Sequence, residues 1–130
     1  MMKEQMTYEL DWTMYYPDDS RVSAIAVLTG HEIEDILAVC PKTESWRSSS
    51  FKEAFHQLGF NTNKRFMAFD PETIYPCLMR YKDSDIKGNY WYCRVYYHGR
   101  VYGNGYSVPF DYWIQDNPNC RVTSMLQVWI

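Results

Sequence analysis

Residues 17–30, "PDDSRVSAIAVLTG", decide how the first part of this 130-residue chain folds. Three neighbouring side chains can accept a hydrogen bond from the first turn of a helix: Asp18, Asp19 and Ser20. The apolar residues that follow recur at helical spacing: Val22, Ile25 and Ala26. Gly30 is typical of the position that ends a helix. The stretch therefore predicts a helix with one buried face, and Ser20 stands where it begins.

Two further helices are predicted before residue 60. "HEIEDILAVC" (31–40) has apolar side chains at the i, i+3, i+4 and i+7 positions of one face, and Pro41 stops it. "SSFKEAFHQLG" (49–59) begins with a capping box formed by Ser50 and Glu53. Its buried stripe consists of Phe51, Ala54, Phe55 and Leu58, and Gly59 ends it.

From about residue 64 the apolar period changes to two, which is typical of strands. Strands are predicted over residues 64–69, 77–81, 90–97, 100–103 and 121–130, and an irregular loop over 104–119. In the last strand one face is predicted to hold Val122, Ser124, Leu126, Val128 and Ile130. Helices followed by an antiparallel sheet predict an α+β fold. We expect three N-terminal helices packed on one face of a C-terminal antiparallel β-sheet, in a single domain spanning residues 1–130.

The composition excludes several function classes. The net charge is −3 and the longest basic run is the pair Lys64–Arg65, so the clustered cations of a nucleic-acid-binding protein are missing. No apolar stretch approaches the roughly 20 residues that span a bilayer, and the N-terminal residues lack the apolar core of a secretory signal. We therefore expect a soluble, cytoplasmic protein that binds neither nucleic acid nor membrane.

Metal and cofactor motifs are also missing from the sequence. The four cysteines form no CxxC pair, and none of the three histidines is spaced as a ligand with another His or Cys. "GNG" at 103–105 is followed by neither a helix nor a lysine, so it is not a phosphate-binding loop. We expect no cofactor, no metal, and reduced, mostly buried thiols.

Ser20 has two interpretations on local physics. At a helix N-terminus it can be a simple cap, or it can occupy the place of a nucleophile, since the helix dipole favours negative charge there. A serine gains less from that position than a cysteine does, and it needs an adjacent general base.

A resemblance bears on this choice. "DSRVSAIAVLTGHEIEDI" (19–36) is similar to the first helix of small papain-like cysteine peptidase domains, including phage and bacterial ones, in which the catalytic Cys opens the helix. "FKEAFHQLGF" (51–60) resembles a later helix of that family, and "GNYWYCRVYYHGRVYGN" (88–104) its hairpin. The resemblance covers roughly residues 17–105 and implies a papain-like fold.

The chain departs from the family at all three catalytic positions. Ser20 stands in place of the Cys, Asn89 or Tyr92 in place of the general-base His, and Gly103 in place of the carboxylate that orients it. His98 lies at the other end of an eight-residue strand, which is about 26 Å long, so it is not expected to reach Ser20. One engineered Cys-to-Ser change would not explain three departures. The resemblance therefore implies a degenerate catalytic triad and leaves enzymatic activity open.

Three functions remain open from the sequence. The first is a non-catalytic binding protein, of the kind that a virus or mobile element encodes, that captures a peptide, a host protein or a small signalling molecule in a cleft near Ser20. Besides Ser20 and Tyr92, its candidate lining residues are Trp46, Arg47, Ser49, Tyr90, Trp91 and Asn104. The "ESWRSSS" loop (44–50) supplies a guanidinium and hydroxyls at a helix start, which suits an anion or peptide carboxylate.

The second function is a cysteine-peptidase-like or related thiol hydrolase with Ser20 at the nucleophile position. The third is a structural or self-associating protein that uses the tyrosine-rich face of residues 90–97. The ligand and the oligomeric state are left open by the sequence.

Overall fold

The computed structural model of the chain describes residues 10, 14–43, 45–86, 91–103 and 105–130. Its helices and strands, in chain order, are α1 (Ser20–Thr29), α2 (Ile33–Val39), α3 (Ser48–Gln57), β1 (Asn61–Thr62), β2 (Met67–Ala68), β3 (Cys77–Asp83), β4 (Tyr92–Tyr97), β5 (Arg100–Gly103), β6 (Tyr106–Pro109), α4 (Phe110–Asp116) and β7 (Cys120–Trp129). The predicted α+β class is confirmed. None of the helices in these ranges is long and apolar enough to cross a lipid bilayer.

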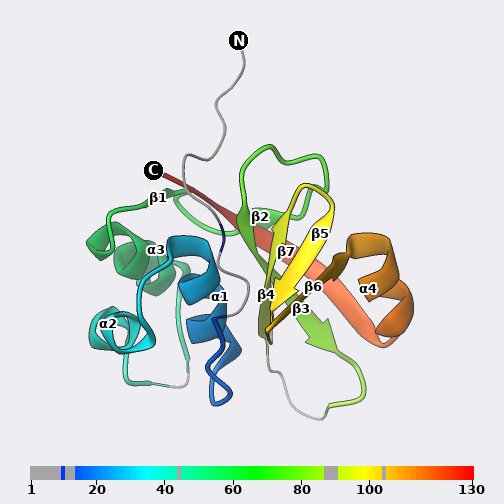
Figure 1. Cartoon of the computed structure of the whole chain (residues 1–130), viewed down its shortest axis with the longest axis horizontal. Coiled ribbons are helices and arrows are strands. Elements are labelled where there is room, and N and C mark those ends of the chain that lie inside the picture. The colour runs from blue at the N-terminus through cyan, green and yellow to red at the C-terminus, as the bar shows by residue number, and fades with distance from the viewer. Residues whose placement is uncertain (1–9, 11–13, 44, 87–90, 104) are drawn as a thin grey trace.

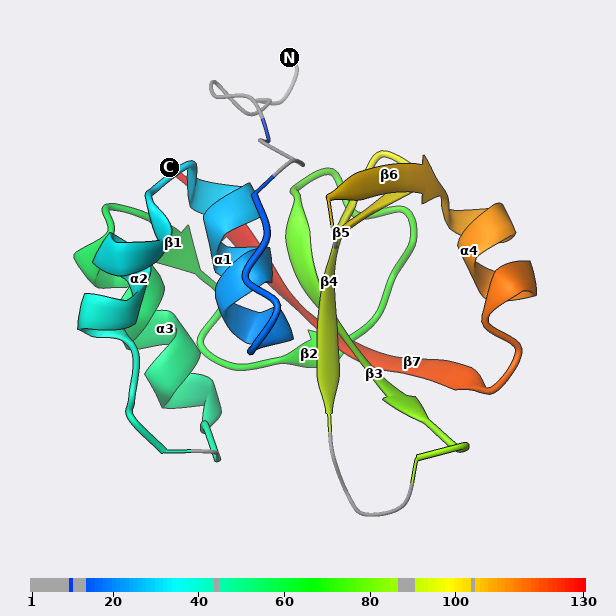
Figure 2. The same ribbon diagram turned by 60° about the horizontal axis from the view of Figure 1, so that its bottom comes forward.

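Seven antiparallel strands form one sheet in the described part of the chain, in the order β1-β7-β3-β4-β5-β6, with β2 also beside β7. Strand β7 thus lies inside the sheet, between β1 and β3, although it comes after the other six strands in the sequence. Figure 1 and Figure 2 show α1, α2 and α3 gathered beside one part of the sheet and α4 at the opposite end of the molecule.

The first core lies between α1–α3 and one face of the sheet. Helix α1 is capped by Asp19 and ends at Gly30, whose positive φ of 74° suits glycine. All of its residues from Val22 to Thr29 are buried, rather than a single face. The reason is that α1 is the middle layer, with contacts to α2 on one side and to β4 and β5 on the other. The sheet contributes Leu78, Cys93, Val95, Leu126 and Val128 to this core.

The start of α3 differs from the prediction. The helix begins at Ser48, before the predicted cap, so Ser50 is its third residue and its hydroxyl accepts a hydrogen bond from the Arg47 backbone N–H at 3.3 Å. Glu53 accepts instead from the Gln57 side chain at 3.0 Å, one helical turn later. The helix itself is confirmed, with Phe51, Ala54 and Phe55 buried.

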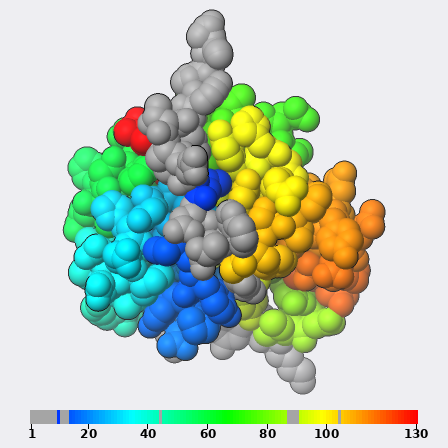
Figure 3. All heavy atoms as spheres, viewed as in Figure 1, coloured from blue at the N-terminus to red at the C-terminus, as the bar shows by residue number. Residues whose placement is uncertain are grey.

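The second core lies on the opposite face of the sheet and is rich in aromatic rings. Its buried members are Cys77, Met79, Tyr81, Tyr96, Val101, Trp113 and Met125. The stretch predicted as an irregular loop supplies β6 and α4, and Trp113 of α4 is 2% exposed. Helices therefore cover both faces of the sheet rather than one. In the space-filling view, residues of α1–α3 (blue to green) and residues of β5–α4 (yellow to orange) occupy opposite sides of the visible face (Figure 3).

Two strands also differ from their predicted patterns. The register between β3 and β7 shifts after Arg80: Arg80 pairs with Ser124 but Tyr81 pairs with Val122. This bulge turns Val122 to the second core, away from Leu126 and Val128. The strand predicted over 64–69 is reduced to Met67–Ala68, the two residues that pair with β7 there.

Candidate functional site

The N-terminus of α1 meets strand β4 at Ser20. Asp19 is the cap: its carboxylate accepts from the Arg21 backbone N–H at 2.9 Å and also pairs with the Arg21 guanidinium at 2.7 Å. This leaves the Ser20 hydroxyl to a different role, since its oxygen accepts a hydrogen bond from the Cys93 backbone N–H at 3.2 Å. Ser20 is therefore not the helix cap but the link between α1 and β4.

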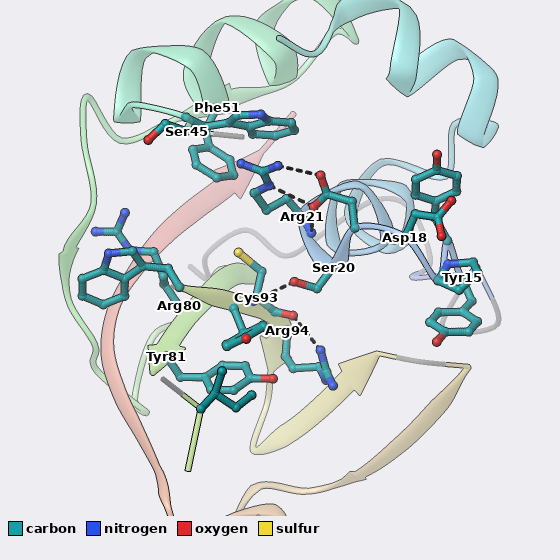
Figure 4. A pocket seen from close by; sticks show the side chains of 17 residues that line it. Tyr15, Asp18, Ser20, Arg21, Ser45, Phe51, Arg80, Tyr81, Cys93 and Arg94 are labelled. Carbon is teal, nitrogen blue, oxygen red and sulfur yellow. Dashed lines mark hydrogen bonds and ion pairs between the residues drawn. The ribbon is translucent and has the colours of Figure 1, made fainter. Parts of the chain in front are cut away.

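A hollow of about 890 Å³ opens beside Ser20. This volume falls within the range of small-molecule sites. Figure 4 shows Ser20 and Cys93 facing one another, with Arg21 on one side of them and Arg94 on the other. The lining residues are Tyr15, Tyr16, Pro17, Asp18, Asp19, Ser20, Arg21, Ser45, Trp46, Phe51, Arg80, Tyr81, Ile86, Trp91, Tyr92, Cys93 and Arg94.

No general base faces Ser20 in the described ranges. The ring of His31 is engaged elsewhere, with Nε2 3.0 Å from the Leu58 carbonyl oxygen. His56 is exposed on α3, and His98 is exposed in the turn between β4 and β5; none of the three lines the hollow. Activation of a serine needs a base within hydrogen-bond reach. Of the two carboxylates among the described residues that line the hollow, that of Asp19 is held by Arg21, and Asp18 is exposed.

Other residue types occupy the positions that the resemblance to papain-like peptidases aligns with the catalytic His and its acid. Asn89 lies outside the described residues. Tyr92 lines the hollow, and its ring packs on Tyr81 with centroids 5.8 Å apart. At Gly103, an added Cβ would collide with Cδ of Arg94 and come within 3.1 Å of its Nε. Glycine therefore makes room for the Arg94 side chain at this position.

Cys93 is one of the site residues that sequence reasoning missed. It is 2% exposed, lines the hollow and bonds to Ser20 through its backbone. Burial raises the pKa of its thiol to about 12, against an ordinary value of 9.0, so it is a neutral thiol rather than a nucleophilic thiolate at neutral pH. The pairing of β4 with the start of α1, which brings Cys93 to Ser20, has no signal in the sequence.

Two arginines in the hollow have no carboxylate partner among the described residues. Arg80 donates from Nε to Ser124 Oγ at 3.0 Å, and its guanidinium lies 4.0 Å from the Phe66 ring centroid and 4.6 Å from that of Trp91. Arg94 donates to the Cys93 carbonyl oxygen at 3.0 Å, while its Nε is buried without a hydrogen-bond partner. Desolvation lowers the pKa of Arg80, although a guanidinium stays charged at neutral pH.

The other predicted binding residues divide into three groups. Trp46 and Trp91 line the hollow, and Trp46 lies under the Arg21 guanidinium at 4.0 Å. Arg47 and Ser49 do not line it: Arg47 precedes α3 as its N-cap residue, and Ser49 is exposed in its first turn. Tyr90 and Asn104 lie outside the described residues.

Within the described ranges no three His, Cys, Asp or Glu side chains gather as a metal site. Comparison of the chain with models of protein families, with curated proteins and with solved structures finds no match. The case for a function therefore rests on the hollow itself.

Proposed function

We propose that this chain is a non-catalytic binding protein, built on a papain-like scaffold, that holds a ligand in the hollow beside Ser20. The observation that carries the proposal is a pocket of ligand size at the place where a papain-like enzyme would have its nucleophile. The Ser20 hydroxyl there accepts from the Cys93 backbone and faces no base within the described residues. The pocket is thus suited to binding and lacks the parts for acyl transfer.

The lining supports binding of a ligand rather than a filled core. Aromatic side chains and arginines are the residue types enriched where proteins bind partners. Trp91 is 40% exposed and Tyr15 is 47% exposed, so two large rings of the lining are open to solvent. The ligand we propose is a peptide, a segment of a host protein or a small signalling molecule.

The tyrosine-rich face of β4 gives less support to self-association. Tyr96 is 2% exposed and packs against Phe69 and Phe110 inside the second core. Tyr92 lines the hollow and contacts Tyr81. These rings are used within the domain and do not form a free surface.

A fragment screen on the whole chain tests the binding proposal. A mixed set of charged and neutral fragments and short peptides is screened by ligand-observed NMR against the wild type and two matched variants. Ser45 is exposed and lines the hollow, so Ser45→Trp should fill it from the rim. Ser49→Trp adds the same ring at an exposed position that does not line it. We expect fragments that bind the wild type and Ser49→Trp but not Ser45→Trp.

Thiol reactivity at position 20 tests the hydrolase alternative. In Ser20→Cys, the rate of alkylation by iodoacetamide at each cysteine is mapped by mass spectrometry, with the half-buried Cys120 as the internal reference. We expect Cys at position 20 to react no faster than Cys120 and the variant to cleave no peptide in the screen. Enhanced alkylation, or cleavage, would replace the binding proposal with a hydrolase.

A further inference from the structure

The hollow has a charge opposite in sign to that of the whole chain. The chain carries −3 at neutral pH, yet three arginines and two aspartates line the hollow. The Asp19 carboxylate is compensated by Arg21 at 2.7 Å, and Asp18 is exposed. Arg80 and Arg94 remain without a carboxylate among the described residues. A local surplus of positive charge in a concave site attracts anions.

The side chains in contact with Arg80 fix the orientation of its guanidinium. Its Nε is bonded to Ser124, and two rings, Phe66 and Trp91, lie on it at 4.0 and 4.6 Å. These contacts restrain the planar group but leave its terminal nitrogens without a hydrogen-bond partner among the described residues. A restrained guanidinium of this kind matches the two oxygens of a carboxylate or phosphate.

An exposed tryptophan lies next to this cation. The residue Trp91 is 40% exposed, and two cations contact its ring: the Arg80 guanidinium lies 4.6 Å from the ring centroid and the Lys82 ammonium 4.3 Å. Trp46 lines the same hollow from the segment before α3. Tryptophan faces are favourable surfaces for a second aromatic ring. Cation and ring are thus side by side at the sheet end of the hollow.

We propose that the hollow binds a small ligand in which a carboxylate or phosphate is joined to a flat ring, with Arg80 binding the anion and Trp91 contacting the ring. This rests on the proposed function, because it names the ligand class of the same hollow. Arg94 follows Cys93 in β4 and extends from the opposite face of that strand. Its side chain also lines the hollow, where it adds positive charge.

Four probes separate the two halves of this ligand: phenyl phosphate, benzoate, benzyl alcohol and inorganic phosphate. Each is titrated into the whole chain in phosphate-free buffer, followed by tryptophan fluorescence and calorimetry. We expect phenyl phosphate or benzoate to bind at least about tenfold more tightly than benzyl alcohol, the difference that a hydrogen-bonded charge supplies. Inorganic phosphate should bind more weakly than phenyl phosphate. Whichever of phenyl phosphate and benzoate binds more tightly identifies the anion.

Two arginine substitutions of equal charge change locate the anion. Arg80→Gln should weaken the best anionic probe by about tenfold or more. Arg100→Gln removes the same charge from exposed β5, where the guanidinium bonds to Ser107 at 2.9 Å and does not line the hollow, so it should change binding less than twofold. Circular dichroism confirms that both variants are folded, and Arg80→Lys gives a milder second test of the guanidinium.

The results separate this inference from the proposed function. Benzyl alcohol binding as tightly as the anions, or Arg80→Gln leaving their affinity unchanged, overturns the anion assignment. If neutral fragments are then still blocked by Ser45→Trp, the hollow remains a binding site with a different ligand class. If no fragment and no anionic probe binds, both proposals fail.

Discussion

The two faces of the sheet are filled in different ways. The face beneath α1–α3 is packed mainly with aliphatic residues and phenylalanines, and α1 is buried along almost its whole length. On the opposite face one short helix, α4, packs its Trp113 against tyrosines and methionines of the strands. Among the described residues the first face gathers eighteen buried side chains, and the second gathers seven. The first joins helices from residues 20–57 to strand residues as distant as Val128, whereas the buried members of the second all lie between Cys77 and Met125. We infer that the first face carries more of the stability, and that the hollow lies where its helical cover ends.

The largest effect is expected at the centre of the first face. Phe55 is 0% exposed and belongs to the core shared by α1–α3 and the sheet. Phe55→Ala should lower the free energy of unfolding by about 4 kcal/mol, because it removes a buried ring and leaves a cavity. Urea denaturation followed by fluorescence measures this loss.

Trp113→Ala is the matched change on the second face. Its loss should be smaller, about 3 kcal/mol, because the seven-residue α4 can detach locally while the rest of the domain stays folded. Hydrogen exchange should then show loss of protection limited to α4 and β6. An equal or larger loss at Trp113 would contradict the difference between the faces.

An intermediate loss of stability is expected for a substitution at Gly103, which lies against Arg94, a residue that lines the hollow. An added Cβ collides with the Arg94 side chain, so Gly103→Ala should lower the free energy of unfolding by about 1–2 kcal/mol. In an Arg94→Ala background the same change should cost much less, since the colliding atoms are gone. Thermal and urea unfolding of the four proteins of this cycle give the coupling. Additive losses would mean that Arg94 does not occupy this space.

The smallest effect concerns the buried thiol of the first face. Because burial raises the pKa of Cys93 from 9.0 to about 12 in the folded chain, the unfolded chain loses this proton first as pH rises. The stabilisation is fully present below pH 9 and is lost as pH rises toward 12. At pH 10 the loss from this group should be about 1 kcal/mol.

Comparison with two alanine variants isolates this contribution. Between pH 8 and 10, Cys93→Ala should lose less stability than the wild type, whereas Cys120→Ala, at a half-buried thiol, should fall nearly in parallel with it. Urea denaturation at each pH provides the measurement. Identical pH dependence in wild type and Cys93→Ala would show that this thiol is not buried in the folded chain.

The elements with strong local signals were predicted well. The helix between Asp19 and Gly30, the apolar stripe of α3 and the hairpin of β4 and β5 all follow from spacing and turn residues. The α4 helix was missed because its seven residues lie between Pro109 and Asn117 and show too short a period. The bulge between Val122 and Ser124 was missed because it depends on how β7 pairs with β3.

The residues that line the hollow also fall into two groups, those predicted from the sequence and those that were not. Ser20, Trp46, Trp91 and Tyr92 were identified from sequence and line the hollow, whereas Arg80, Arg94 and Cys93 were not foreseen as its members. The sequence by itself determined the α+β class, the capped first helix and the absence of a cysteine at position 20. Only the tertiary structure decided that Asp19 caps that helix while Ser20 bonds to Cys93, 73 residues away. The physical reason is that helix ends and strand faces are set by neighbouring residues, but the pairing of distant segments is set by packing across the whole domain.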